Sequence, residues 1–401
     1  MSHAHGIKVS GDQVRIPAGS LWGKLHIIGA VVGGAGIAAT FGLGASDMKQ
    51  AYFSWLVAYA FFLSLALGGL FFTIVQFAAR AGWSVVVRRF AETMMATLPV
   101  FVLLFAPIAL GLHDLYHWTH DNPEDKILAA KSPYLNEQFF YVRAGVYFAV
   151  WTLLSVWFYR KSVGQDTSGD HEVTRKLQIA SGPAILLFAL TLTFAAFDWL
   201  MSLDPHWYST MFGVYYFAGT AVTTFAFLAV LAVLTRSSGM LDGILSTEHF
   251  HDLGKLTFGF TVFWTYIAFS QYFLIWYANI PEETIWFAHR WDNDWRGVTT
   301  LLVLGHFVVP FFFLLPRTIK RNPKTLLLGA GLMIVMHAVD LYWLVMPVLH
   351  HEGPHFSVLD LTAFLGVGGV FFAVFGALLR KHALIPVKDP RLPESVSFQN
   401  V

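Results

Sequence analysis

The feature that most constrains this chain is a series of ten apolar stretches, each long enough to cross a lipid bilayer. A hydrocarbon core of about 30 Å requires roughly 20 apolar residues in a helix, at about 1.5 Å of rise per residue. The stretches are apolar on every face, whereas the strands of a membrane barrel alternate. We therefore predict an all-α integral membrane protein with ten transmembrane helices, at 22–42, 51–79, 90–112, 137–160, 178–202, 208–234, 255–279, 298–316, 325–347 and 357–380.

The composition excludes several other classes of protein. Hydrophobic residues make up 56% of the 401 residues and charged residues 13%, against about 45–50% and about 25% in soluble domains. A formal charge of +1 provides no basic excess for binding nucleic acid. Because the chain has no cysteine, it holds no disulfide and no thiolate-bound iron–sulfur cluster. Any such cluster would belong to a partner subunit.

The distribution of Lys and Arg predicts the orientation of the chain. Twenty of the 26 Lys and Arg residues fall on one side of the predicted membrane, five on the other, and Arg143 lies within a span. Basic residues near helix ends stay in the cytoplasm, so both termini are expected there. The N-terminus shows no signal-peptide pattern. We expect a cytoplasmic segment 1–21, a membrane domain 22–380 and a cytoplasmic tail 381–401, with polar linkers at 161–176, after four spans, and at 235–254.

Ionisable residues at membrane depth are the candidate functional groups. Each costs at least about 2.5–3.5 kcal/mol on insertion scales and needs a partner, a wet cavity or a task. His337 and Asp340 are spaced i, i+3 on one helix face, where the carboxylate can orient or charge the imidazole. Arg143 and Asp198 have similar predicted depths and are an expected ion pair. The alternative for every such pair is a packed contact that only joins two helices.

His306 and Glu92 complete the intramembrane candidates. His306 lies near mid-membrane, four residues before Pro310, which deprives the His306 carbonyl of its helical partner. Pro99, Pro107 and Pro183 are expected to have the same effect in other spans, which favours polar interior cavities, although a proline can also simply kink a helix. Glu92 with Gln76, and the group Glu248, His249, His251 and Asp252, lie near the cytoplasmic edge and could collect protons from inside, although a solvated loop or helix end is the simpler interpretation.

Metal and haem sites are weaker interpretations, and we expect neither. His113, His117 and His120 have ligand-like spacing in an outer loop, as do His350, His351 and His355, but such loops more often form interfacial belts or subunit contacts. A transmembrane pair of b haems needs four histidines. The spans contain only His26, His306 and His337. Aromatic runs such as Phe269–Asn279 and Phe212–Gly219 suit a flat hydrophobic ligand such as a quinone, but they are also typical of lipid-facing or core positions.

Two longer runs resemble a known family. FDWLMSLDPHWYSTMFGVYYFAG (Phe197–Gly219) and FSQYFLIWYANIPEET (Phe269–Thr284) are similar to the polysulfide reductase NrfD family, and most similar to the second NrfD-like membrane subunit of bacterial alternative complex III. The resemblance covers nearly the whole chain. It implies two four-helix bundles, spans two to five (about 51–202) and six to nine (about 208–347), flanked by spans one and ten.

The resemblance also implies a function in the bacterial inner membrane. The chain would be a non-autonomous subunit of a quinol:electron-acceptor oxidoreductase, beside a second NrfD-like subunit, with iron–sulfur clusters and haem c on partner chains and no covalently bound cofactor here. It would contribute a proton path, a quinone-binding pocket or both to respiratory or photosynthetic electron transfer, and no catalytic residue is assigned. The candidates for either role are His337, Asp340, His306, Asp198, Arg143, Glu92, Asp204 and His206. A secondary transporter and a structural scaffold are the alternatives.

Overall fold

A computed structural model describes residues 13–120 and 124–400 of the chain, so the first twelve residues of the expected segment 1–21 lie outside the described part. The expected all-helical membrane fold is confirmed: ten helical segments, some made of several consecutive short helices, are long and apolar enough to span a bilayer, and the described residues contain no strand. The helices of four residues or more are α1 (Leu21–Leu43), α2 (Met48–Ala78), α3 (Val85–Met95), α4 (Leu98–Leu104), α5 (Ala106–Leu110), α6 (Leu112–Leu115), α7 (Lys126–Lys131), α8 (Glu137–Ser168), α9 (His171–Trp199), α10 (Phe212–Ser237), α11 (Thr247–Ala278), α12 (Pro281–Trp291), α13 (Trp295–Leu302), the π-helical turn η4 (Val303–Val308), α14 (Val309–Leu314), α15 (Arg317–Arg321), α16 (Pro323–Val345), α17 (Val358–Lys381) and α18 (Leu392–Val396).

The expected linker at 161–176 was wrong. Helix α8 continues to Ser168 and α9 begins at His171, so only a two-residue turn separates them. Gly169, at φ +66°, ends α8 in the left-handed conformation that glycine tolerates best. Asp170 then caps α9 by accepting the Glu172 N–H. The polar residues therefore extend two helices beyond the apolar stretch rather than separating them.

The expected break at 235–254 is also shorter in the structure. Helix α10 ends at Ser237 and α11 begins at Thr247, because Ser246 and His249 form a reciprocal capping box there. The second half of the expected break is thus the first two turns of α11.

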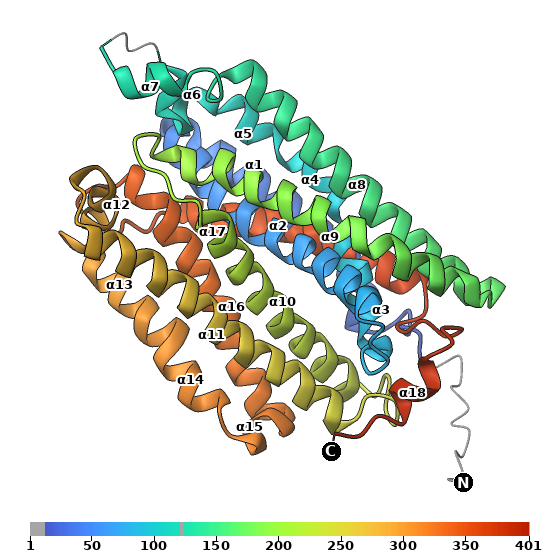
Figure 1. The fold of residues 1–401 in the computed structure, drawn as a ribbon. Coiled ribbons are helices and arrows are strands. Elements are labelled where there is room, and N and C mark those ends of the chain that lie inside the picture. Colours follow the sequence, from blue (N-terminus) through green and yellow to red (C-terminus); the bar gives the residue numbers. More distant parts are fainter. Residues whose placement is uncertain (1–12, 121–123, 401) are drawn as a thin grey trace.

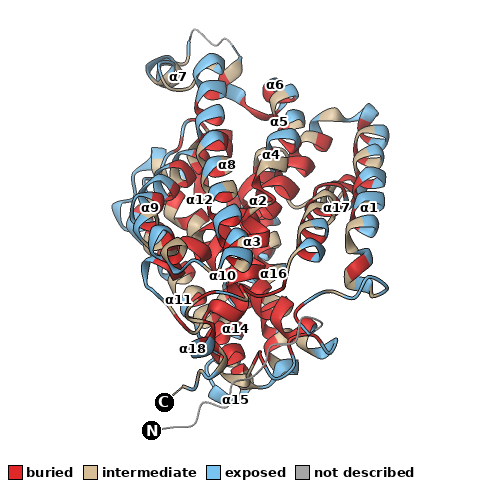
Figure 2. Cartoon of the chain, turned by 90° about the vertical axis from the view of Figure 1, so that its right-hand side faces the viewer, coloured by how far each residue is buried: buried red, intermediate tan, exposed pale blue. Residues whose placement is uncertain are grey.

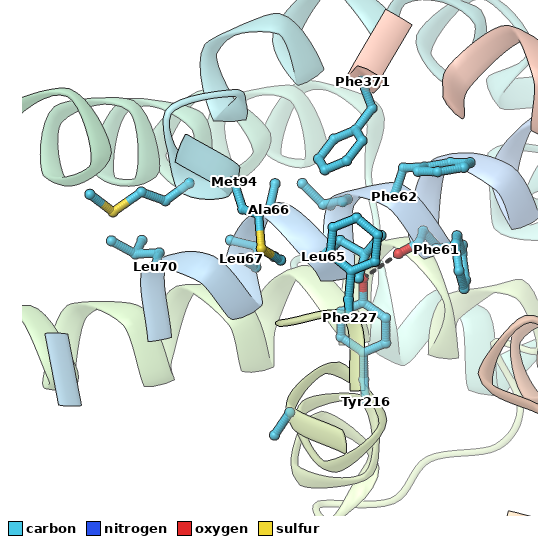
Figure 3. Close-up of a cluster of buried hydrophobic side chains, with 14 of the residues drawn as sticks. Phe61, Phe62, Leu65, Ala66, Leu67, Leu70, Met94, Tyr216, Phe227 and Phe371 are labelled. Carbon is cyan, nitrogen blue, oxygen red and sulfur yellow. Dashed lines mark hydrogen bonds between the residues drawn. The ribbon is translucent and has the colours of Figure 1, made fainter. Parts of the chain in front are cut away.

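Helix α2 lies at the centre of the molecule (Figures 1 and 2). It contacts α3, α9, α10, α16 and α17, and nearly all of its residues are buried. Figure 3 shows part of this core, where Phe62 of α2 meets Phe371 of α17 and the Tyr216 hydroxyl of α10 donates to the Ala60 carbonyl at 2.8 Å. Because α2 contacts helices from both halves of the chain, it joins α3–α9 to α10–α16.

Helices α1 and α17 pack closely against each other along a glycine seam. A Cβ built on Gly36 would lie 2.3 Å from the Gly366 nitrogen, and one built on Gly369 would lie 2.2 Å from the Gly33 nitrogen. Only glycine permits this backbone approach. The pair is therefore fixed by its small residues, and α17 attaches it to α2.

Prolines break two of the membrane-crossing segments. Pro99 and Pro107 occupy the first turns of α4 and α5, where a missing N–H is tolerated. Pro310 is the second residue of α14, directly after the π-helical turn, and the Val309 N–H bonds to the Leu304 carbonyl five residues back. Helix α9 continues through Pro183 without interruption.

The two ends of the helix bundle differ. At the end that we name the termini end, the Leu384 N–H donates to the Val14 carbonyl and the Leu241 N–H to the Gln13 carbonyl, which brings both described chain ends together. The opposite end, the loop end, contains α6, α7 and α12 and the connections around them (Figure 1).

Candidate functional site

Three intramembrane candidates from the sequence meet in one place. His306 lies in η4, and His337 and Asp340 lie in α16. One ring nitrogen from each histidine and one carboxylate oxygen of Asp340 all lie within 4.8 Å of one another. All three side chains are buried, with exposed fractions of 0%, 1% and 1%. We name these residues the central triad. The sequence predicted that His337 and Asp340 share a helix face, and the structure adds His306 to them.

Asp340 is held by two aromatic donors rather than by a cation. The Tyr215 hydroxyl of α10 donates to Oδ1, and the Trp264 indole N–H of α11 donates to Oδ2 at 3.1 Å. The indole of Trp264 also lies against the His306 ring, with 3.8 Å between ring centroids. A carboxylate without a cationic partner at this depth is costly, which makes it a candidate for proton exchange.

His337 is oriented by α2. The Ser64 hydroxyl donates its only hydrogen to the Phe61 carbonyl at 2.7 Å, so in its 3.1 Å contact with His337 Nε2 it accepts. The network therefore assigns the proton of a neutral His337 to Nε2 and leaves Nδ1 with a free lone pair. Gly219 of α10 leaves room beside that atom, because a Cβ there would lie 2.8 Å from Nδ1.

A pocket of about 970 Å³ lies beside the two aromatic donors of Asp340, and none of the three triad residues lines it. Tyr215 and Trp264, the two donors to Asp340, form part of its wall. Its polar wall residues include Gln271 and Arg290, and its remaining lining is mostly apolar or aromatic, including Phe269, Tyr272, Ile275, Trp276, Phe287, Leu302, Val303, Phe307 and Trp343. We name it the lateral pocket, since Phe269, Tyr272 and Trp276 are largely exposed on the flank of α11.

Arg290 is a buried cation in the wall of this pocket. Its guanidinium donates to the Trp343 and Leu344 carbonyls at 3.2 and 2.9 Å, at the C-terminal end of α16, and lies 3.6 Å from the Trp286 ring. No carboxylate pairs with it among the described residues. Burial lowers its pKa to about 9, so it is still positive at pH 7. The pocket thus has a positive charge at its loop end.

Arg143 and Asp198 form the ion pair that their depths suggested. Arg143 Nε and Nη2 donate to the two carboxylate oxygens at 2.7 and 3.0 Å, and the Tyr147 hydroxyl donates to Oδ2 at 2.7 Å. Arg143 also lies over the Tyr134 ring. The pair joins α8 to α9 and involves none of the central triad.

Glu92 lies in an ion network at the termini end. Its Oε1 accepts from Arg88 Nε at 3.0 Å, and its Oε2 lies 2.9 Å from Arg89 Nε. Arg88 also bonds Asp389 of the C-terminal tail, and Arg89 bonds Asp166 of α8. Glu92 also accepts from the Ser162 hydroxyl at 2.7 Å, and its side chain is fully buried rather than at the solvated helix end that was the simpler interpretation.

Asp204 and His206 lie at the loop end, away from the central triad. His206 Nε2 lies 2.6 Å from Asp125 Oδ2. This contact connects the segment before α10 to Asp125, the N-cap residue of α7. The backbone N–H of Leu128, followed by His206, lowers the pKa of Asp125. These contacts fix a surface loop.

Sequence reasoning missed three residues of the site. Ser64 and Arg290 gave no local signal, and Trp264 was one aromatic residue among many. Tyr215 and Gly219 lay within a run that the sequence identified as suitable for a flat ligand. Comparison with known proteins adds no constraint, since no family model and no curated protein matches the chain.

Proposed function

We propose that this chain is an NrfD-like membrane subunit of a quinol:electron-acceptor oxidoreductase in the bacterial inner membrane. In this role the lateral pocket takes the quinone ring and the central triad conducts the released protons. Electrons pass to iron–sulfur and haem c groups on partner chains, which include a second NrfD-like subunit. The sequence resemblance supports the family, and the geometry of the lateral pocket supports the division of roles.

One observation supports the proposal most strongly: the pocket and the buried carboxylate share two residues. Tyr215 and Trp264 line the pocket and also donate to Asp340. Ligand pockets of about 300–1,000 Å³ with an apolar lining and a few convergent polar groups are typical of small-molecule sites. Gln271 and Arg290 provide further polar groups in the wall, and the exposed aromatic flank of α11 offers a route from the lipid for an isoprenoid tail.

The arrangement can move a proton by one exchange. A quinol hydroxyl that donates to the Tyr215 oxygen allows Tyr215 to pass its own hydrogen to Asp340, so one proton enters and one leaves at the tyrosine. Oxidation of quinol releases two protons with two electrons, so the exchange would occur twice per turnover. His337 and His306, which have ring nitrogens within 4.8 Å of Asp340, are the next groups able to accept each proton from Asp340.

The test is quinol oxidation by the purified assembly. The variants Asp340→Asn and Tyr215→Phe keep the shape of each side chain and remove its proton exchange. We expect each to lower turnover at least tenfold with the subunits still assembled, because general acid–base groups contribute about 10²–10⁴-fold. The matched control is Asp242→Asn, an exposed carboxylate whose loss should leave turnover unchanged.

The same preparation tests the alternatives. Co-isolation with haem c and iron–sulfur subunits is expected. A stable chain that purifies alone and moves a solute across vesicles would instead indicate a secondary transporter. Unchanged turnover and proton release in both variants would indicate a scaffold.

A further inference from the structure

We propose that the central triad is a binding site for one divalent transition-metal ion, best matched by Zn²⁺. His306, His337 and Asp340 form the only group among residues 13–120 and 124–400 whose His, Asp or Glu ligand atoms are close enough for this. The proposal departs from the sequence-based expectation of no metal site. An ion held by all three residues occupies the lone pairs through which they would accept protons, so the ion and the proton exclude each other at the central triad, and bound zinc would block the exchange proposed above.

The first argument is the state of the histidine nitrogens. Neither ring nitrogen of His306 has a hydrogen-bond partner within the described structure, and His337 Nδ1 has none either. Both side chains are almost completely buried. An unpaired buried polar atom costs about 1–3 kcal/mol. A shared cation beside the Asp340 carboxylate would pair His337 Nδ1 and one ring nitrogen of His306, and would leave only the second His306 nitrogen without a partner.

The second argument is the orientation of His337. A metal-binding histidine usually donates its other ring N–H to a neighbouring acceptor, which fixes the tautomer and directs the free lone pair at the ion. The Ser64 contact does this at Nε2. The lone pair is left on Nδ1, in the space that Gly219 keeps open.

The third argument is the support of the carboxylate. Asp340 accepts from Tyr215 and Trp264, and such outer hydrogen bonds orient a ligating carboxylate. Tetrahedral Zn²⁺ has ligands at about 2.0–2.2 Å and therefore about 3.4 Å from one another. The ligand atoms of the triad lie within 4.8 Å of one another, so binding draws them closer together by at most about 1.4 Å. The His306 ring is held by stacking on Trp264 rather than by a hydrogen bond.

The chemistry of the donors selects the class of ion. Two imidazoles and one carboxylate suit Zn²⁺ and other first-row metals, whereas Ca²⁺ and Mg²⁺ prefer oxygen ligands. The carboxylate offsets one of the two positive charges of the ion. The lateral pocket comes closest to the triad at Tyr215 and Trp264, which line it and donate to Asp340.

The experiment measures zinc in the purified protein, with its partner subunits if they co-purify. After exposure to Zn²⁺ and desalting, elemental analysis should give one zinc per chain, and X-ray absorption should show two imidazole ligands and no sulfur. His306→Ala, His337→Ala and Asp340→Asn should each raise the Kd for zinc at least tenfold. Gly219→Ala keeps all three ligands and should weaken zinc binding by placing a methyl group beside His337 Nδ1.

Two controls keep the result specific. His117→Ala removes a histidine of the loop end and should leave the stoichiometry and the absorption spectrum unchanged. The wild-type spectrum needs no variant, so it remains decisive if a triad variant fails to fold. Less than about 0.1 zinc per chain in the wild type, or zinc retained with the same Kd in folded triad variants, would overturn the proposal.

Discussion

Replacing Arg143 with Gln should be among the most destabilising single changes in this chain. The Arg143 and Asp198 side chains are 8% and 0% exposed, and three donors reach the carboxylate, two of them from Arg143. Without Arg143, the buried carboxylate keeps the Tyr147 hydroxyl and loses both charged donors. Removing one partner of a buried ion pair costs about 3–5 kcal/mol, most of it the desolvation of the remaining charge.

The assay is reversible unfolding in mixed detergent micelles, followed by tryptophan fluorescence. We expect Arg143→Gln to lower the free energy of unfolding by about 3–5 kcal/mol. The double variant Arg143→Gln with Asp198→Asn should be more stable than the single variant, because it no longer buries an unpaired charge. The matched control is Arg175→Gln, which breaks an exposed i, i+3 pair with Glu172 and should leave the free energy of unfolding nearly unchanged.

The reasoning is refuted by either of two results. One is an Arg143→Gln variant as stable as Arg175→Gln. The other is a double variant whose loss equals the sum of the two single losses, which would mean that the two side chains are not coupled.

Three further predictions concern parts of the fold around the site. Gly36→Ala should lower the free energy of unfolding by about 1–3 kcal/mol, because the new Cβ clashes with the Gly366 backbone. Gly34→Ala should not, because no atom lies within 4 Å of a Cβ built on Gly34, and a comparison of the two melting temperatures tests this. Lys320→Met should destabilise the end of α14 by about 1–3 kcal/mol, because the Lys320 amine donates to the Leu314, Leu315 and Pro316 carbonyls. Amide hydrogen exchange at 314–322 should become faster in this variant, and the control Lys324→Met, at an exposed lysine, should leave the exchange rates unchanged. Burial lowers the pKa of His350, so the folded protein favours the neutral imidazole, and the stability that this provides at pH 7.5 is lost as the pH falls below the unfolded pKa of about 6.5. The melting temperature of His350→Gln should therefore drop less between pH 7.5 and 5.5 than that of the wild type. An equal drop in the two proteins would contradict the assignment.

The ten spans could be predicted because a helix that crosses the bilayer requires a continuous apolar stretch of a certain length. Such a stretch consists of consecutive residues, so it can be recognised in the sequence without knowing how the helices pack. The polar segment 161–176 was misread for the same reason: hydropathy reports where lipid ends, whereas helix ends depend on caps such as Gly169 and Asp170.

Within the site, sequence reasoning succeeded where two residues share a helix or a depth. His337 and Asp340 share a face of α16, and Arg143 and Asp198 are opposite charges at one level. Sequence reasoning could not place His306 beside His337 and Asp340. The direction in which η4 presents His306 depends on how α13 and α14 pack against the other helices. The lateral pocket is a property of packing between helices, and the buried cation Arg290 comes from a short helix outside the spans.

Photolabelling by a quinone analogue tests the account most directly. An azido-quinone irradiated with the purified assembly should label peptides of α11 and α12 that line the lateral pocket, and excess unlabelled quinone should compete. Ala288→Trp places an indole in the pocket lining and should abolish both the labelling and quinol oxidation, while Val146→Trp, on the exposed face of α8, should change neither. Label found only on other subunits, or unchanged in Ala288→Trp, would contradict a quinone site in this chain.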